Sequence, residues 1–229
     1  SLVYKKFRDE AQLFVAEGPK IVSELIELVP QNVQKVYAME AWAAQNKNIP
    51  HLQIVSEAEL QKISGLQTPN QVVALVQQFN WKAKNVSNSF CLYLDAIQDP
   101  GTLGTIIRIA DWFGLSQIVC GNGCADVYNS KVVQSTMASI ARTPVWYDLN
   151  GTWLIDQKVP IYAATLHGKP LNEFSQVKEG VLIIGNESKG ISAELMALAT
   201  HGITIPRKGA AESLNAAVAT GIILSHLLN

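Results

Sequence analysis

The chain has 229 residues, of which 48% are hydrophobic and 16% charged, enough apolar material for a substantial core and too little charge for a disordered chain. Its 18 Lys and Arg stand against 19 Asp and Glu, so a strongly basic protein-wide field is excluded and any nucleic-acid contact needs a local patch. Three cysteines without paired spacing argue against a disulfide framework, and Cys120 and Cys124 lack the second ligand pair of a zinc site.

The first 79 residues are predicted to alternate short helices and strands. Pro19 is suited to a first helical turn, and apolar residues recur at helical spacing over 21–29. Ser56 and Glu59 form a potential capping box at the start of another helix. β-Branched and apolar runs predict strands over 33–39 and 71–79. The polar, aperiodic run 80–88 predicts a linker, which divides the chain into domains 1–79 and 89–229.

From residue 89 the strands become longer and more apolar. We expect strands over 90–97, 117–120, 144–147, 159–166, 181–185 and 203–205. Helices are expected around 103–113, 130–141, 192–199 and 213–228. Continuous apolar strands separated by helices are typical of a mostly parallel sheet covered on both faces, so the predicted fold class is α/β.

Several familiar sites are excluded by their missing signatures. The chain has no P-loop, and Asp126 stands where the dinucleotide fingerprint that begins at Gly121 requires glycine. The four histidines are scattered without metal-ligand or triad spacing, so no metal site is expected. These absences argue against a P-loop nucleotidase and a Rossmann-type dehydrogenase.

Three segments of the second half carry polar residues at strand ends. In the first, Asp99-Pro100-Gly101 makes a turn, a helix begins near Thr102, and Arg108 lies two turns later in a segment expected to be mostly buried. In the second, Gly185 and Gly190 flank a carboxylate after a buried strand. In the third, Ser213 is placed to cap the last helix. Taken singly, each is compatible with a solvated helix residue or an ordinary connection.

Taken together, the segments D-P-G-x-L-G-x-x-x-R, I-G-N-E-x-x-G and I-P-x-x-x-x-x-E-S-L-N-x-x-x-A resemble the SpoU (TrmH-like) family of the SPOUT superfamily, over about residues 90–229. The resemblance implies an S-adenosylmethionine-dependent RNA ribose 2′-O-methyltransferase. It also implies an α/β domain with a deep trefoil knot that holds the cofactor, and a homodimer with its site completed near the subunit interface. Residues 5–8 and 14–20 resemble the family's accessory substrate-binding domain, a small α/β fold similar to kink-turn-binding ribosomal proteins.

The resemblance assigns roles to individual residues. Arg108 would orient the ribose and phosphate, because an arginine side chain stays protonated and is therefore a poor general base. Glu187 would hold Arg108 or the loop. The catalytic residues it implies are Arg108, Glu187, Ser213 and Asn215. The cofactor-binding residues it implies are Leu166, Gly185, Asn186, Gly190, Ile205 and Leu214. We expect RNA to contact Lys5, Lys6, Arg8, Lys20 and Thr102.

One position departs from the family pattern. Thr102 occupies the place of an asparagine, which leaves a catalytically weak RNA-binding pseudoenzyme as an alternative. The other four polar positions are intact, so we expect an active enzyme. The accessory domain favours ribosomal RNA over transfer RNA. No apolar stretch approaches the roughly 20 residues that span a bilayer and no leader opens the chain, so we expect a cytoplasmic protein without a membrane partner.

Overall fold

The computed structural model describes residues 1–229 and divides into two compact units. Unit 1 comprises Ser1–Asn80 and Asp126–Ala141, and unit 2 comprises Trp81–Ala125 and Arg142–Asn229. A short segment from the second half of the sequence therefore groups with the N-terminal residues. The linear boundaries 1–79, 80–88 and 89–229 stay a prediction.

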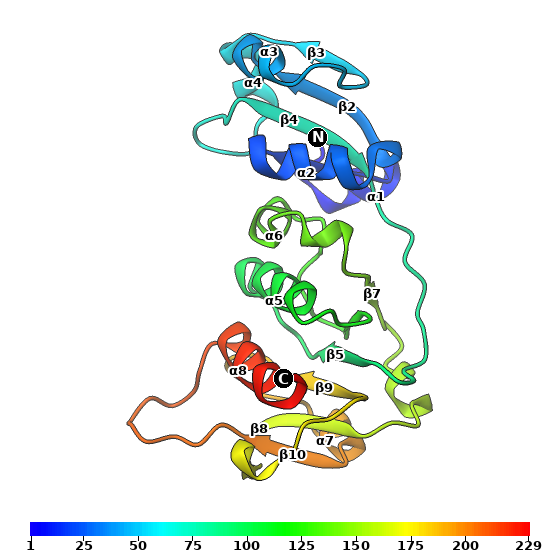
Figure 1. Cartoon of the computed structure of the whole chain (residues 1–229), viewed down its shortest axis with the longest axis vertical. Helices are drawn as coiled ribbons and strands as arrows, with labels where there is room; N and C mark the ends of the chain where they lie inside the picture. Colours follow the sequence, from blue (N-terminus) through cyan, green and yellow to red (C-terminus); the bar gives the residue numbers. More distant parts are fainter. The chain divides into compact units, whose positions relative to one another are not determined.

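Unit 1 is built on a four-stranded mixed sheet of order β1-β4-β2-β3 (Figure 1). β4 runs antiparallel to both of its neighbours, whereas β2 and β3 are parallel. The strands are β1 (Leu13–Glu17), β2 (Val33–Ala38), β3 (Leu52–Ile54) and β4 (Val72–Gln77). The helices are α1 (Lys5–Ala11), α2 (Pro19–Leu28), α3 (Glu40–Gln45), α4 (Glu57–Ile63) and α6 (Ser130–Thr136).

Local sequence signals explain the two clearest helices of unit 1. α2 starts at Pro19, whose fixed φ suits a first turn, and buries Ile21, Val22 and Leu25. α4 begins with the predicted capping box, in which Ser56 and Glu59 satisfy each other's backbone N–H groups. Both predictions are confirmed.

Unit 2 contains a six-stranded sheet of order β10-β8-β9-β5-β6-β7, in which every neighbouring pair is parallel. Its central strands, β5 (Phe90–Leu94) and β9 (Gly180–Ile184), are buried along their whole length, which explains their continuous apolar sequence. The outer strands are β6 (Ile118–Cys120), β7 (Val145–Tyr147), β8 (Ile161–Pro170) and β10 (His201–Thr204). The α/β class and the parallel sheet are confirmed.

The helices of unit 2 are α5 (Pro100–Trp112), α7 (Ala193–Leu198) and α8 (Ala216–Leu228). α5 begins earlier than predicted because the Asp99 carboxylate accepts a hydrogen bond from Thr102 N over 2.7 Å and caps the helix. α8 begins later than predicted because its cap is Asn215, whose Oδ1 accepts from Ala217 N and Val218 N. The expectation that Ser213 caps α8 is therefore wrong.

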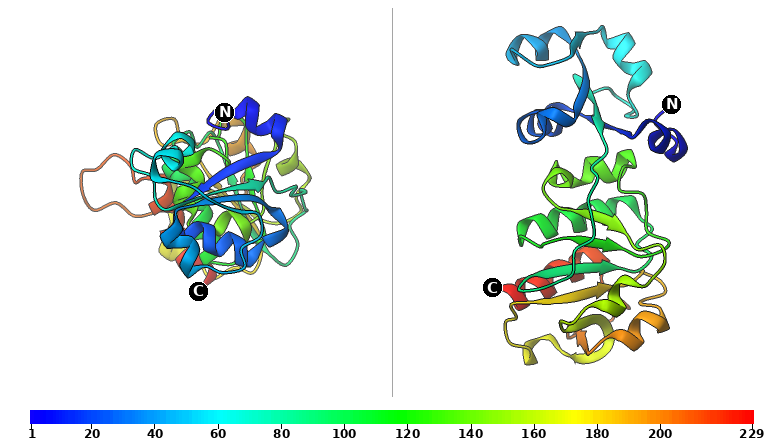
Figure 2. Two further views of the ribbon diagram at one scale, coloured as in Figure 1. Left: turned by 90° about the horizontal axis from the view of Figure 1, so that it is seen from above. Right: turned by 90° about the vertical axis from the view of Figure 1, so that its right-hand side faces the viewer.

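The predicted linker has neither helix nor strand, yet it is tied to unit 2. Val86 is buried in the hydrophobic core of that unit, and Val86 N donates to Gln157 Oε1 over 2.9 Å. None of the helices combines the length and the apolar character needed to cross a membrane. The loop between β10 and α8 projects from unit 2 in Figure 1 and again in the left view of Figure 2.

Candidate active site

The three segments singled out in the sequence follow strands of one parallel sheet, so they meet at its carboxyl edge. Two side-chain hydrogen bonds join them. Asn186 Nδ2, after β9, donates to Ala96 O, after β5, over 2.8 Å. Asn215 Nδ2, before α8, donates to Thr102 Oγ1, in the first turn of α5, over 3.3 Å. The edge of the sheet is therefore a connected polar site.

A cavity of about 1030 Å³, which we call the motif cavity, opens between β8 and the second and third of these segments, and the first segment does not line it. It is large enough for a cofactor-sized ligand. Glu187 and Ser213 line it as well, and the buried Oε1 of Glu187 has no hydrogen-bond partner. All six residues expected to bind the cofactor line this cavity: Leu166, Gly185, Asn186, Gly190, Ile205 and Leu214.

The loop from Gly185 to Gly190 is a tight wall of the motif cavity. Asn186 and Gly190 exchange two backbone hydrogen bonds, of 3.0 and 2.9 Å. A Cβ on Gly185 would lie 2.4 Å from the Gly190 carbonyl carbon, and Gly190 itself has φ +71°. Only glycine fits either place without strain. The Asn186 side chain accepts from two backbone N–H groups of the same loop, so it also fixes the shape of this wall.

The carboxylate of Glu187 is the clearest case in the motif cavity of a hydrogen-bond acceptor that lacks a donor. Its Oε1 is buried and has no hydrogen-bond partner. A buried carboxylate oxygen without a donor is costly, so this position calls for a donor from a ligand or a second chain. No hydrogen bond or ion pair joins Glu187 to Arg108, the partner that the resemblance implied.

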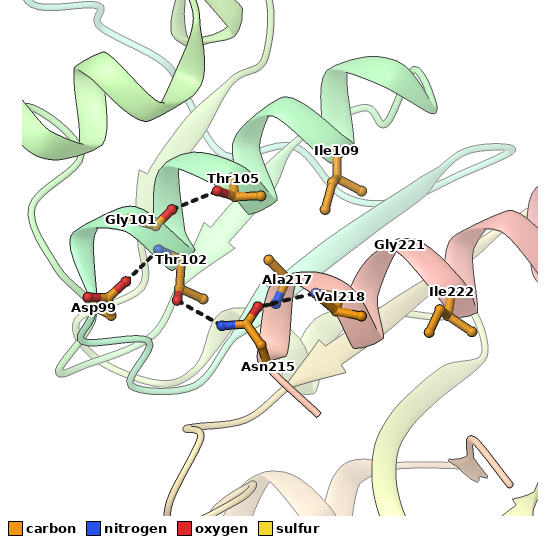
Figure 3. Close-up of a pocket in the computed structure, with 10 residues that line it drawn as sticks. All are labelled: Asp99, Gly101, Thr102, Thr105, Ile109, Asn215, Ala217, Val218, Gly221 and Ile222. Carbon is orange, nitrogen blue, oxygen red and sulfur yellow. Dashed lines mark hydrogen bonds between the residues drawn. The ribbon is translucent and has the colours of Figure 1, made fainter. Parts of the chain in front are cut away.

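A second cavity, of about 530 Å³, lies between α5 and α8. Figure 3 shows Thr102 and Asn215 pointing toward each other at one end of it. The rest of its lining includes the apolar side chains Ile109, Val218 and Ile222, of which Val218 is 51% exposed. Thr102 and Asn215 are thus brought together, but away from the lining of the motif cavity.

Arg108 lines neither cavity. Its neighbours Ile106 and Ile107 are fully buried, whereas Arg108 faces solvent and makes no hydrogen bond or ion pair. The expectation of a mostly buried environment is wrong at this residue, because the helical turn of 100° per residue places it opposite the buried stripe. Arg108 therefore does not stabilise the fold through an ion pair within the chain, and its guanidinium is available to bind a ligand.

Cys124 lies beside the carboxyl end of β5, where its Sγ donates to Leu94 O over 3.3 Å. A hydrogen bond from the Cys120 thiol lowers the pKa of Cys124, although burial opposes the shift. The same bond, together with complete burial, raises the pKa of Cys120. The pKa values of the two neighbouring thiols are therefore shifted in opposite directions.

The residues expected to contact RNA from the N-terminal domain differ in availability. Arg8 is 4% exposed, and its Nη2 pairs with Asp126 Oδ2 at 2.6 Å while Nη1 donates to two backbone carbonyls. This placement makes Arg8 an internal anchor of unit 1 and contradicts its expected exposure to phosphate. Lys5 and Lys6 are exposed and each faces an acid one turn later, and Lys20 is exposed without a partner.

Sequence reasoning missed several polar residues of the motif cavity. Lys189, Arg207 and Lys208 line it, as does His167. Three of the four, Lys189, Arg207 and Lys208, occupy variable positions of the quoted motifs. The resemblance rests on the fixed positions beside them. The sequence does place these three cations beside motif residues. That placement predicts a shared site only once the fold shows that the two loops line one cavity.

Comparison with known proteins supports the same reading of the chain. The SpoU rRNA Methylase family matches residues 89–225, and the MRM3-like substrate binding domain matches residues 1–74. The 23S rRNA (guanosine(2553)-2′-O)-methyltransferase RlmP of Bacillus subtilis is 32% identical, over 97% of this chain and 91% of that protein.

Two solved structures resemble the whole chain. A protein from Porphyromonas gingivalis, described as a TrmH-family RNA methyltransferase, has a TM-score of 0.86 and 33% identity, covering 99% of this chain and 94% of that one. An AdoMet-bound rRNA methyltransferase from Sinorhizobium meliloti has a TM-score of 0.85 and 31% identity, covering 100% and 93%. The sequence segments, the parallel sheet and these similarities agree, and the chain belongs to the SpoU rRNA Methylase family.

Proposed function

We propose that this protein transfers the methyl group of S-adenosylmethionine to the 2′-hydroxyl of a ribose in structured RNA, with ribosomal RNA favoured over transfer RNA. The observation that carries the proposal is the motif cavity, which gathers the six expected cofactor residues around the unpartnered Glu187 Oε1. The RlmP relative and the AdoMet-bound neighbour from Sinorhizobium meliloti support the cofactor and the RNA class.

The lining of the motif cavity fits this cofactor. Leu166 and Leu214 are 62% and 46% exposed, an unfavourable state for large apolar side chains that a stacked purine would relieve. Glu187 Oε1 would accept a hydrogen bond from a hydroxyl or ammonium group of the ligand. When bound, S-adenosylmethionine supplies an electrophilic methyl group on a positively charged sulfur.

The protein's own residues must orient a poor nucleophile, because a ribose hydroxyl keeps its proton at neutral pH. Arg108 has a free guanidinium whose forked donors suit simultaneous contact with a phosphate and the hydroxyl. Because an arginine guanidinium keeps its protons in proteins, it acts as an orienting group rather than a base, and the hydroxyl proton leaves late or with help from the RNA phosphate. Ser213, exposed at the motif cavity, would add a hydrogen bond to substrate or cofactor.

A second copy of the chain would complete this site. Arg108 lines neither cavity of its own chain, so its proposed role requires a motif cavity presented by another subunit. The exposed apolar residues Val218 and Ile222 on α8 lie beside α5 and form a face suited to burial in a homodimer. Family resemblance supports this dimer, a trefoil knot in unit 2 and, for residues 1–79, a fold similar to kink-turn-binding ribosomal proteins. We also propose a cytoplasmic location.

Methyl transfer from radiolabelled S-adenosylmethionine tests the proposal directly. Unmodified 23S rRNA, 16S rRNA and tRNA transcripts would each be incubated with the full chain, and 2′-O-methylated positions mapped by resistance to alkaline cleavage. Labelling of rRNA alone is the expected result. Labelling of tRNA alone would favour the alternative substrate. Calorimetric cofactor binding without transfer to any RNA would favour a pseudoenzyme, in which Thr102 has replaced the family's asparagine.

Subunit complementation tests the shared site. Arg108→Ala and Gly185→Ala each disable one half, the latter because the new Cβ meets the Gly190 backbone. Mixed after subunit exchange, the two inactive proteins would form hybrids with one intact site and regain activity. If both act within one subunit, the mixture stays inactive. Glu187→Ala serves in place of Gly185→Ala should that variant fail to fold.

A further inference from the structure

Three cations line the motif cavity from two separate loops. Lys189 belongs to the loop after β9, and Arg207 and Lys208 belong to the loop between β10 and α8. We call these three residues the cationic rim. All are exposed, and none makes an ion pair within the chain. Unpaired cations on two sides of one opening indicate an anionic ligand that reaches both.

The cationic rim differs in this respect from Lys5, Lys6 and Arg8 of unit 1, whereas Lys20 of that unit is also exposed and unpaired. Lys5 lies beside Asp9 and Lys6 lies within 3.9 Å of Glu10. Arg8 is committed to its buried pair with Asp126. Each of these positive charges is offset locally, so they attract a phosphate less strongly than unpaired groups do. The rim is thus a stronger candidate for phosphate contact than Lys5, Lys6 or Arg8.

The charge of the expected cofactor argues against the cofactor as the rim's only ligand. At neutral pH its sulfonium and ammonium groups outweigh its one carboxylate, so it carries net positive charge. Two carboxylates, Glu187 and Glu212, also line the motif cavity and suit those positive groups. Three cations beside a cationic cofactor are unfavourable unless a polyanion neutralises them. The RNA backbone next to the methylated ribose is such a polyanion.

The loop that carries Arg207 and Lys208 is free to follow an RNA strand. Residues 206–213 form no backbone hydrogen bond, and the one side-chain bond within the loop joins Arg207 Nη1 to Ala211 O at 3.2 Å. Every residue from 206 to 213 is exposed, and the loop projects from unit 2 in Figures 1 and 2. A guanidinium and an ammonium on such a loop can approach successive phosphates without disturbing the core.

We propose that the cationic rim binds the phosphates that flank the target ribose, so that the β10–α8 loop positions RNA over the motif cavity. This inference rests on the proposed function and adds the residues that bind the RNA phosphate backbone at the site of methyl transfer. They act as positioning residues through ground-state contacts, so their loss raises the KM for RNA and leaves kcat nearly unchanged.

The double variant Arg207→Ala/Lys208→Ala tests the inference, with Lys158→Ala/Lys178→Ala as a control that removes two exposed cations outside the cavity. Filter binding to an unmodified 23S rRNA transcript would be measured between about 50 and about 200 mM KCl. The slope of log affinity against log salt should flatten by about 1 for each rim cation removed and stay unchanged in the control. Calorimetric affinity for S-adenosylmethionine should match wild type in both variants.

Three results would separate the inference from the proposed function. Wild-type salt dependence and KM in the rim variant, alongside active wild-type enzyme, would overturn the rim alone. Loss of cofactor affinity in the rim variant would also overturn it, because the cations would then serve the cofactor carboxylate. A wild-type protein that binds cofactor but methylates no RNA would overturn both. Unchanged melting temperatures would confirm that the substitutions leave the fold intact.

Discussion

Asn215 Nδ2 donates a hydrogen bond to Thr102 Oγ1 over 3.3 Å and so joins the start of α8 to the first turn of α5. The same Asn215 caps α8 through its Oδ1, which leaves its amide nitrogen free to make this contact. Thr102, the residue that departs from the family pattern, therefore retains a polar link to the third motif. The departure keeps the acceptor and removes only the amide donor.

Thr102→Val should lower the free energy of unfolding by about 0.5 to 1.5 kcal/mol, because it removes one hydrogen bond at a buried position while the exposed Asn215 amide turns to water. Thr105→Val is the control, since its exposed hydroxyl bonds only to Gly101 O of its own helix. Thermal melting would compare the two. Equal melting temperatures would show that the link to Asn215 contributes no stability.

Asn215→Ala should cost about 1 kcal/mol of stability, because α8 loses the acceptor for two backbone N–H groups. Asn215→Asp keeps that acceptor, and its negative charge suits a helix start, but it loses the amide donor. We therefore expect the Asp variant to melt near wild type and to turn over more slowly. Wild-type turnover in the Asp variant would reduce the role of Asn215 to capping.

The main architecture of unit 2 was predictable because its determinants are local. The apolar runs 90–94 and 180–184 are buried on both faces, and that requirement leaves a direct trace in composition. Helix starts were less predictable, because several capping residues compete within a few positions. Asp99 caps α5, which was expected to begin near Thr102, and Asn215 caps α8 in place of Ser213. Residue type alone does not reveal the geometry that decides these starts.

Contacts between segments that are distant in the sequence could not be predicted, because they produce no local sequence pattern. Tyr128 stacks on Phe14 with ring centroids 5.0 Å apart, which helps to place residues 126–141 in unit 1, and no periodic pattern connects the two rings. The residues of the site likewise fall into those that the sequence identifies and those that only the folded structure reveals. Motif residues such as Gly185 and Leu214 were identified by resemblance and share one cavity, whereas Arg207 required the folded loops to be seen.

Arg8→Ala should destabilise the protein by about 3 kcal/mol, because it leaves the Asp126 carboxylate, 15% exposed, without its partner. For a chain of this size that corresponds to roughly 6 to 12 °C in melting temperature. Lys5→Ala is the matched control, since it removes a surface pair worth at most about 1 kcal/mol. Parallel melts of the two variants check this, and equal small shifts would contradict an anchoring role for Arg8.

Cys124 should be the cysteine that alkylates first, because the hydrogen bond from Cys120 lowers its pKa and raises its thiolate fraction at any given pH. Its iodoacetamide rate should therefore level off at lower pH than that of a free thiol. Cys120→Ala removes the donor, so the pKa of Cys124 should rise and the rate profile should move to higher pH. Mass spectrometry of alkylated peptides provides the measurement, and an unmoved profile would exclude Cys120 as the cause.

Arg108→Ala should reduce kcat and kcat/KM together by about 10² to 10³, because the guanidinium orients ribose and phosphate chiefly in the transition state. Its melting temperature should match wild type, since Arg108 is exposed and makes no hydrogen bond or ion pair within the chain. Arg108→Lys should recover little activity, because a point charge cannot reproduce forked donors. Cofactor affinity measured by calorimetry should be unchanged in both variants, because the proposed contacts of Arg108 are with the ribose and phosphate and not with the cofactor. Near wild-type turnover in a stable, cofactor-binding Arg108→Ala protein would remove this residue from the reaction.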